Sequence, residues 1–225
     1  MRTWQTIRSP VLRRHVHQCA YAAIILSGGY EEAGDGGRFC VRAGDVVLHD
    51  RFEAHTNRLS CSGATVLNLK IPRGIHFIPG RATVADPDDL VRASERSQTE
   101  ALTRLLSRIR RSRIDDPSDW PDLLAADLRR NPTLSLSRWS RTHRLSPWAV
   151  SRGFSQVFGI SPSAFRARMR ARHALQAIEI GSASLANIAA ELNFADQPHM
   201  TRSVKTLTGQ SPVALRSRAN RFKTR

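Results

Sequence analysis

The chain has few cysteines and no long hydrophobic run. Only 3 of its 225 residues are cysteine. The odd number and wide spacing of Cys19, Cys40 and Cys61 argue against a disulfide framework and favour a reducing compartment. The longest apolar stretch, residues 21–27, is too short to cross a bilayer and lacks the flanks of a signal peptide. We therefore expect a cytoplasmic protein with no membrane partner.

Acidic residues are scarce relative to basic ones. The chain holds 35 Lys and Arg against 19 Asp and Glu, a formal net charge of +16. From Pro117 onward, 17 Lys and Arg stand against 6 Asp and Glu. A basic segment of this kind is typical of proteins that bind a polyanion. The sequence shows neither a Lys-rich amphipathic membrane helix nor the aromatic cluster of RNA-binding motifs, so DNA is the favoured polyanion.

The C-terminal half contains an internal repeat. Residues 136–166 match residues 185–216 at an offset of 49, which becomes 50 after the added Ala195. The matched pairs include Arg152 with Arg202, Phe154 with Val204, Gly159 with Gly209 and Arg166 with Arg216. A duplicated unit of this size indicates one supersecondary element used twice.

Each copy predicts a helix, a tight turn and a second helix. Ser135 and Ser184 precede runs of apolar residues at helical spacing and can cap the first helices. Ser146 and Asp196 can cap the second helices, and the matched glycines suit their C-terminal ends. Asn193 lies where the second turn needs a left-handed backbone, which Asn tolerates. Two helices joined in this way match the helix-turn-helix, whose second helix enters the major groove of DNA.

The second helix of each copy is expected to bury its apolar face and to present a polar, basic face to DNA. Arg pairs with guanine, Gln pairs with adenine, and an exposed Trp can lie against a sugar or a thymine methyl. The residues expected to contact DNA are Trp148, Ser151, Arg152 and Gln156 in the first copy, and Gln197, His199, Thr201, Arg202 and Lys205 in the second. The alternative is a plain helical bundle with solvated polar faces, which the matched caps, arginines and glycines disfavour.

With these motifs the chain resembles the AraC-type family of bacterial transcription regulators over residues 117–219. The resemblance rests on L-S-P-x-x-x-S-R-x-F-x-x-x-F-G-x-S-P at residues 145–162 and on I-A-x-E-L-x-F-x-D-Q-x-H at residues 188–199. It implies two helix-turn-helix units bridged by one long helix, here about residues 163–180. It also implies reading roles for the residues named above.

Three residues depart from the family pattern. Asn193 replaces a usual Gly before Phe194, and Val204 replaces a usual aromatic residue. Gly153 lies inside the first reading helix, where Gly costs about 1 kcal/mol relative to Ala.

Residues 2–79 alternate short apolar runs with glycine-rich turns. The predicted strands are residues 21–26, 38–41, 46–49 and 65–71. The predicted turns are Gly28-Gly29, residues 34–37, Gly44-Asp45 and residues 61–63. This pattern predicts a small antiparallel β-barrel or jelly roll. We therefore expect an α+β protein with a sensor barrel at residues 1–82, a helical connector at 83–116 and a double helix-turn-helix domain at 117–225.

The pair His15-x-His17, residues 44–47 and His55 resemble the cupin-type sensor domain common in this family. In metal-binding cupins such a set converges on one ion, so His15, His17 and His55 are candidate ligands of Zn²⁺, Fe²⁺ or Ni²⁺. Residues 18–27 hold no carboxylate to complete that site, and the alternative is a pocket without a metal or cofactor. Motif position places His17, Tyr21, Glu31 and His55 at the mouth of a pocket for a small-molecule effector.

The connector predicts two helices. Asp86-Pro87 suits a helix N-terminus, and a second helical run carries a stripe of Leu102, Leu105, Leu106 and Ile109. Its other face carries Arg104, Arg108 and Arg111. The stripe either packs against the barrel or forms a dimer contact, so a monomer and a homodimer both stay open. Residues 114–119 read as a linker, and residues 120–130 as the first helix of the DNA-binding domain.

These observations predict a sequence-specific DNA-binding transcription regulator controlled by a small-molecule ligand in the N-terminal barrel. Its expected partners are double-stranded DNA, an effector and RNA polymerase. The sequence offers no nucleophile–base pair, phosphate loop or paired acids, so we do not expect an enzyme. Two alternatives stay open: a metal-dependent cupin enzyme with a fused basic domain, and an architectural DNA binder without a ligand.

Overall fold

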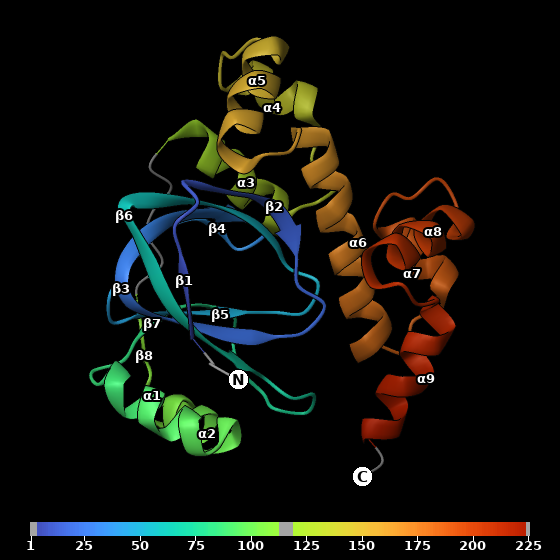
Figure 1. Cartoon of the computed structure of the whole chain (residues 1–225). Helices are drawn as coiled ribbons and strands as arrows, with labels where there is room; N and C mark the ends of the chain where they lie inside the picture. Colours follow the sequence, from blue (N-terminus) through green and yellow to red (C-terminus); the bar gives the residue numbers. More distant parts are fainter. Residues whose placement is uncertain (1–3, 113–118, 224–225) are drawn as a thin grey trace. The chain divides into compact units, whose positions relative to one another are not determined.

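The computed structural model describes residues 4–112 and 119–223. The chain divides into two compact units, Met1–Ser118 and Asp119–Arg225 (Figure 1). The first is a β-sheet with two helices, and the second is built from helices, which confirms the predicted α+β class. The predicted linker at residues 114–119 lies, except for Asp119, outside the described residues. No described helix combines the length and hydropathy that a membrane crossing requires.

The first unit is one antiparallel sheet that curls round on itself (Figure 1). The strand order is β1-β6-β3-β5-β7-β8, with β2 paired to β6 and β4 paired to β3. The strands are β1 (Trp4–Ile7), β2 (Val11–Val16), β3 (Tyr21–Gly34), β4 (Gly37–Arg42), β5 (Asp45–His49), β6 (Ala54–Lys70), β7 (Gly80–Thr83) and β8 (Arg110–Arg111). Three of the predicted strands fall within β3, β4 and β5, and the fourth, residues 65–71, overlaps β6 and extends one residue beyond it. The strands β1, β2, β7 and β8 were not predicted.

Two of the predicted turns are instead bulges inside long strands. Gly28 in β3 and Gly63 in β6 both have left-handed backbones, with φ of 69° and 71°. A Cβ on Gly28 would collide with the carbonyl oxygen of Gly63, and the pairing register between β3 and β6 shifts here. The prediction of turns at Gly28-Gly29 and residues 61–63 is wrong, because these glycines permit a close approach of paired strands rather than ending them. The turns at residues 34–37 and Gly44-Asp45 are confirmed.

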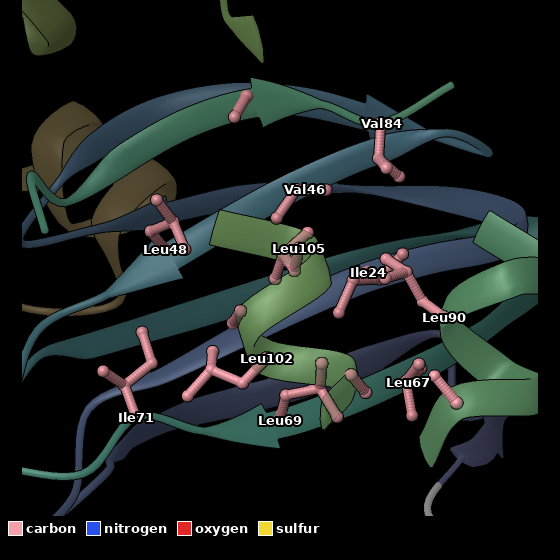
Figure 2. Packing of buried hydrophobic residues seen from close by; sticks show 14 of the residues in the cluster. Ile24, Val46, Leu48, Leu67, Leu69, Ile71, Val84, Leu90, Leu102 and Leu105 are labelled. Carbon is pink, nitrogen blue, oxygen red and sulfur yellow. The ribbon is translucent and has the colours of Figure 1, made fainter. Parts of the chain in front are cut away.

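Helices α1 (Pro87–Arg96) and α2 (Gln98–Arg108) cover one face of the sheet. Leu90 of α1 and Leu102 and Leu105 of α2 point at the apolar side chains of the strands (Figure 2). The strand residues of this cluster include Ile24, Val46, Leu48, Leu67 and Leu69. The leucine stripe of the connector therefore packs on the sheet, as the first of its two alternatives predicted.

The second unit places a long central helix between two helical pairs (Figure 1). Its described helices are α3 (Trp120–Arg130), α4 (Leu136–Thr142), α5 (Pro147–Phe158), α6 (Pro162–Ile180), α7 (Leu185–Glu191), α8 (Gln197–Thr208) and α9 (Pro212–Lys223). The pairs α4–α5 and α7–α8 are the two predicted helix-turn-helix units, and α6 is the predicted bridging helix. Both predictions are confirmed, as is that of α3.

The two helix-turn-helix units begin and end their helices in the same way. The side chains of Ser135, Ser146, Ser184 and Asp196 each accept a hydrogen bond from the backbone N–H three residues further on. Gly159 and Gly209 end α5 and α8 with φ of 67° and 73°. In the turns, Asn193 has the predicted left-handed backbone, and Arg144 takes the same conformation in the first unit.

The arginines that follow the two helix-turn-helix units make equivalent hydrogen bonds. Arg166 on α6 donates to the carbonyl oxygen of Leu134 at 3.0 Å, and Arg216 on α9 donates to that of Ala183 at 2.7 Å. Each acceptor residue immediately precedes the serine that caps the first helix of its unit. The helix that follows a unit is thus anchored to the start of that unit, which explains why this arginine occurs in both copies.

Gly153 has a packing role within α5. A Cβ at this position would lie 2.5 Å from Cζ2 of Trp120 on α3. The glycine therefore allows the Trp120 ring to lie against α5, and this packing offsets the helix-propensity cost that the sequence indicated.

Candidate nucleic-acid interface and histidine cluster

Helices α5 and α8 have one buried and one exposed face, as predicted. Val150, Phe154 and Phe158 of α5 are buried, and so are Met200, Val204 and Leu207 of α8. The predicted DNA-contacting side chains lie on the other faces. The exposed ones are Trp148, Ser151, Arg152, Gln156, Gln197, Arg202 and Lys205, while His199 and Thr201 are half-buried.

The exposed face of α5 carries an organised pair. Trp148 is 67 % exposed, although large aromatic side chains are normally buried. The guanidinium of Arg152 lies over its ring at 5.1 Å from the centroid. Stacking on the ring restricts the Arg152 side chain while leaving its donors available to a phosphate or a guanine edge.

On α8, His199 is held at the first helical turn. Its backbone N–H donates to Oδ1 of Asp196 at 2.6 Å, and its ring lies edge-on to Phe194 at 5.3 Å between centroids. Arg202, one turn further on, is exposed. The packing of His199 therefore holds the N-terminal turn of α8, where helix-turn-helix proteins contact base edges.

The length of α6 suits a bipartite DNA site. At 19 residues, the helix is about 28 Å long. Major-groove segments on one face of B-DNA recur about every 34 Å. A helix of this length between the two units is therefore compatible with α5 and α8 entering successive groove segments.

In the sheet unit, the three predicted histidines converge. His15 on β2 pairs in register with His55 on β6, and their Nε2 atoms lie 3.1 Å apart. One ring nitrogen from each of His15, His17 and His55 falls within 4.8 Å of the others. The predicted convergence of the H-x-H pair with the distant histidine is confirmed, while metal binding by it stays a prediction.

Three residues that were not predicted to belong to a site join this cluster: Glu32, His49 and Glu53. Glu32 of β3 faces Nδ1 of His55 at 3.2 Å and Nε2 of His49 at 3.6 Å. On its other side, Nδ1 of His49 lies 3.7 Å from Oε1 of Glu53. These four side chains are each less than 10 % exposed. Residues 18–27 indeed lack a carboxylate, but β3 continues through its bulges and brings Glu32 to the cluster.

Of the predicted effector residues, the structure brings three together. The ring of Tyr21 lies between His17 and His49, with centroids 4.4 Å and 4.6 Å away, and His55 adjoins both histidines. Glu31 is not among the residues that converge. Neighbouring residues of a strand point to opposite faces, and it is Glu32 whose carboxylate reaches the histidines.

The histidines differ in their protonation. Burial, followed by the charges of His55, His15 and His49, lowers the pKa of His17 to about 4. Burial also lowers the pKa of His15. Burial acts in the same direction on His49, but the carboxylates of Glu32 and Glu53 outweigh it and raise the pKa of that imidazole. His15 and His17 are thus neutral at pH 7, in the form that offers a lone pair.

Comparison with known proteins finds similarity for the helical unit. Residues 139–218 match the model of a helix-turn-helix domain family. Among solved structures, the C-terminal domain of the response regulator AraT from Geobacillus stearothermophilus is 20 % identical and covers 46 % of this chain and 88 % of its own, with a TM-score of 0.42. A DNA-binding transcriptional dual regulator from Escherichia coli K-12 is 18 % identical, covering 49 % and 99 %, with a TM-score of 0.43.

A third structure, ToxT from Vibrio cholerae, spans both units. It is 10 % identical and covers 95 % of this chain and 98 % of its own, with a TM-score of 0.40. No curated protein sequence matches the chain. All three TM-scores lie below 0.5, so these structures carry no argument about this chain, and the family match covers residues 139–218 only.

Proposed function

We propose that the protein is an AraC-type transcription regulator, whose helix-turn-helix domain, matched at residues 139–218, reads a bipartite DNA site under the control of an effector. One observation carries this proposal. The reading faces of α5 and α8 occupy equivalent positions in two copies of one unit, joined by a helix of suitable length. The basic balance of this half supplies the attraction to phosphates.

Within each reading helix, the side chains divide into two roles. Arg152 and Arg202 supply bidentate donors for base edges, because they occupy equivalent exposed positions on α5 and α8. Lys205 and the hydroxyls of Ser151 and Thr201 supply phosphate or base contacts, which fix the register of the protein on the duplex.

The sheet unit is the candidate sensor. A small molecule that contacts His17, Tyr21 and His55 would lie against three rings that already pack on one another. Differential affinity of this molecule for two states of the protein would then bias DNA binding. A contact with RNA polymerase is the further step by which such a regulator would act.

The proposal is tested by selecting binding sites from a random DNA pool at about 150 mM salt, where non-specific phosphate binding is weakened. We expect an enriched motif with two half-sites about one helical turn apart. The matched control is Arg96→Ala, which removes an exposed arginine from α1 of the sheet unit. Affinity without any enriched motif, with Arg152→Ala and Arg202→Ala behaving like Arg96→Ala, would refute specific reading and favour an architectural DNA binder.

A further inference from the structure

We propose that Glu32, His49 and His55 form a binding site for one divalent transition-metal ion within the sheet unit. This set differs from the set His15, His17 and His55 that the cupin resemblance suggests. It consists of two imidazoles and one carboxylate, a combination that suits Zn²⁺, Fe²⁺, Co²⁺ or Ni²⁺. The proposal does not depend on DNA binding by the helical unit.

The three side chains are buried but incompletely satisfied. Glu32, His49 and His55 are only 2 %, 1 % and 3 % exposed. Oε2 of Glu32, both ring nitrogens of His49 and Nδ1 of His55 nevertheless lack a hydrogen-bond partner. A buried polar atom that nothing satisfies destabilises the folded state. One ligand atom from each of the three residues lies within 4.8 Å of the others, which indicates a common partner that accepts several lone pairs.

The tautomers at His55 point to a cation. Nδ1 of His15 lies 2.9 Å from the carbonyl oxygen of Arg13, which can only accept, so neutral His15 carries its proton on Nδ1. Its Nε2 then accepts from Nε2–H of His55 at 3.1 Å. The lone pair of His55 Nδ1 is therefore left facing Oε1 of Glu32 at 3.2 Å. Two acceptors at this distance need a positive charge between them.

His49 presents the same conflict to the same carboxylate. Its Nδ1 faces Glu53 and its Nε2 faces Glu32. A protonated ring donates to both carboxylates, whereas a neutral ring donates to one and turns a lone pair towards the other. With the proton on Nδ1, three acceptors converge: Nε2 of His49, Nδ1 of His55 and the carboxylate of Glu32. A metal ion accepts a lone pair from each of the three atoms, whereas one proton can bridge only two of them.

The spacing is close to that of a coordination shell. Ligand atoms about 2.0–2.2 Å from a tetrahedral ion are separated by about 3.3–3.6 Å from each other. The two distances from Glu32 oxygens to imidazole nitrogens are 3.2 Å and 3.6 Å. Small side-chain movements therefore suffice for the three residues to hold an ion.

Each proposed imidazole ligand also has an outer partner that fixes its orientation. Metal-bound histidines usually donate their second N–H to a carboxylate or another acceptor. Glu53 lies beside the second nitrogen of His49, and His15 accepts from that of His55. His15 thereby uses both of its nitrogens, which leaves no lone pair with which it could bind a metal itself.

Two glycines make room for this arrangement. A Cβ on Gly36 would lie 2.8 Å from Oε1 of Glu53, and one on Gly34 would lie 2.7 Å from Cβ of His55. The β3–β4 hairpin therefore closes tightly against the side chains around the proposed site. This accounts for glycines at a place where the hairpin turn alone needs only one left-handed residue, Gly37.

The test uses the full-length chain, freed of metal by a chelator and titrated with Co²⁺ while visible absorption is recorded. We expect one Co²⁺ per chain and the d–d bands of a nitrogen and oxygen site, with Zn²⁺ displacing it. Glu32→Gln and His49→Gln should abolish this signal. Glu53→Gln should weaken binding about 10- to 100-fold, as removal of an outer partner does. His17→Gln should leave binding unchanged, like the control His76→Gln, which replaces an exposed histidine of the same unit.

Several outcomes would overturn the proposal. Loss of binding in His17→Gln with retention in Glu32→Gln would place the ion on the H-x-H set instead. Charge-transfer bands of a cobalt thiolate would place it on the exposed cysteines. No binding to the wild-type chain would mean that a proton fills the gap between the acceptors. If a ligand variant fails to fold, X-ray absorption of the zinc-loaded wild type identifies the ligand atoms instead. The proposal requires imidazole and oxygen ligands without sulfur.

Discussion

The helical unit and the sheet unit bring their functional residues together in different ways. In the helical unit, the cap, the turn and the reading face of each copy lie within one stretch of chain, and the same pattern returns in the second copy. In the sheet unit, the histidine and glutamate cluster combines side chains from β3, β5 and β6 with His15 of β2 and His17, which follows β2. A reading helix can therefore be located by local spacing, whereas the cluster depends on strand pairing and its bulges.

The largest expected effect compares the cores of the two repeated copies. Phe154 and Val204 hold equivalent buried positions, but Phe154 also packs on Phe158 and Phe165. Phe154→Ala should destabilise the helical unit by about 3–5 kcal/mol through lost burial and a residual cavity. Val204→Ala removes fewer atoms and should cost less. Urea unfolding followed by tryptophan fluorescence measures both, and equal losses would show that the first copy relaxes around the cavity.

Gly153→Ala tests whether packing outweighs local propensity. Ala is the better helix former by about 1 kcal/mol, but its Cβ would collide with the Trp120 ring. Overpacking of this kind costs about 1–3 kcal/mol, so we expect net destabilisation in a urea titration. In a Trp120→Ala background the same change should become stabilising. A gain in stability in the wild-type background would mean that α3 moves aside at no cost.

Matched arginine variants compare the two reading helices. Arg152→Ala and Arg202→Ala should each weaken binding to the selected site by about 1–3 kcal/mol and relax the preference at one base position. Because they occupy equivalent positions, the two changes should affect different half-sites. Competition binding with single-base variants of the site measures this. A uniform loss over all sequences would make these arginines phosphate contacts only.

The smallest expected effect concerns the pH dependence of the sheet unit. His17 has a folded pKa of about 4 against an ordinary value of 6.5, so the unfolded chain binds more protons between these values. The contribution of His17 to the free energy of unfolding should therefore be fully present above pH 6.5 and be lost as the pH drops towards 4. His17→Gln should reduce the slope of the free energy of unfolding against pH in this range. Urea titrations at several pH values, followed by tyrosine near-ultraviolet circular dichroism, test it because both tyrosines lie in β3. An unchanged slope would assign the effect to other groups.

Some of the features that these variants test could be predicted from the sequence, and others could not. The caps, the left-handed Asn193 and the bridging helix follow from local rules of capping and periodicity, and all are present. The same local rules fail at Gly28 and Gly63, where a glycine pair marks a close crossing of two paired strands. They also misjudge Gly153, because its partner Trp120 belongs to another helix.

The sequence by itself determined the repeat, which can be seen in the residues alone. It also determined the capped helices, the exposed polar faces of α5 and α8 and the α+β class, because caps and periodicity depend on residues within a few turns of one another. Only the tertiary structure decided that Glu32 and His49 join His55, that the arginines after each unit anchor its start, and that the leucine stripe of α2 covers the sheet. The physical reason is strand register. Because the side chains of a strand alternate between its two faces, one bulge changes which residues face the interior.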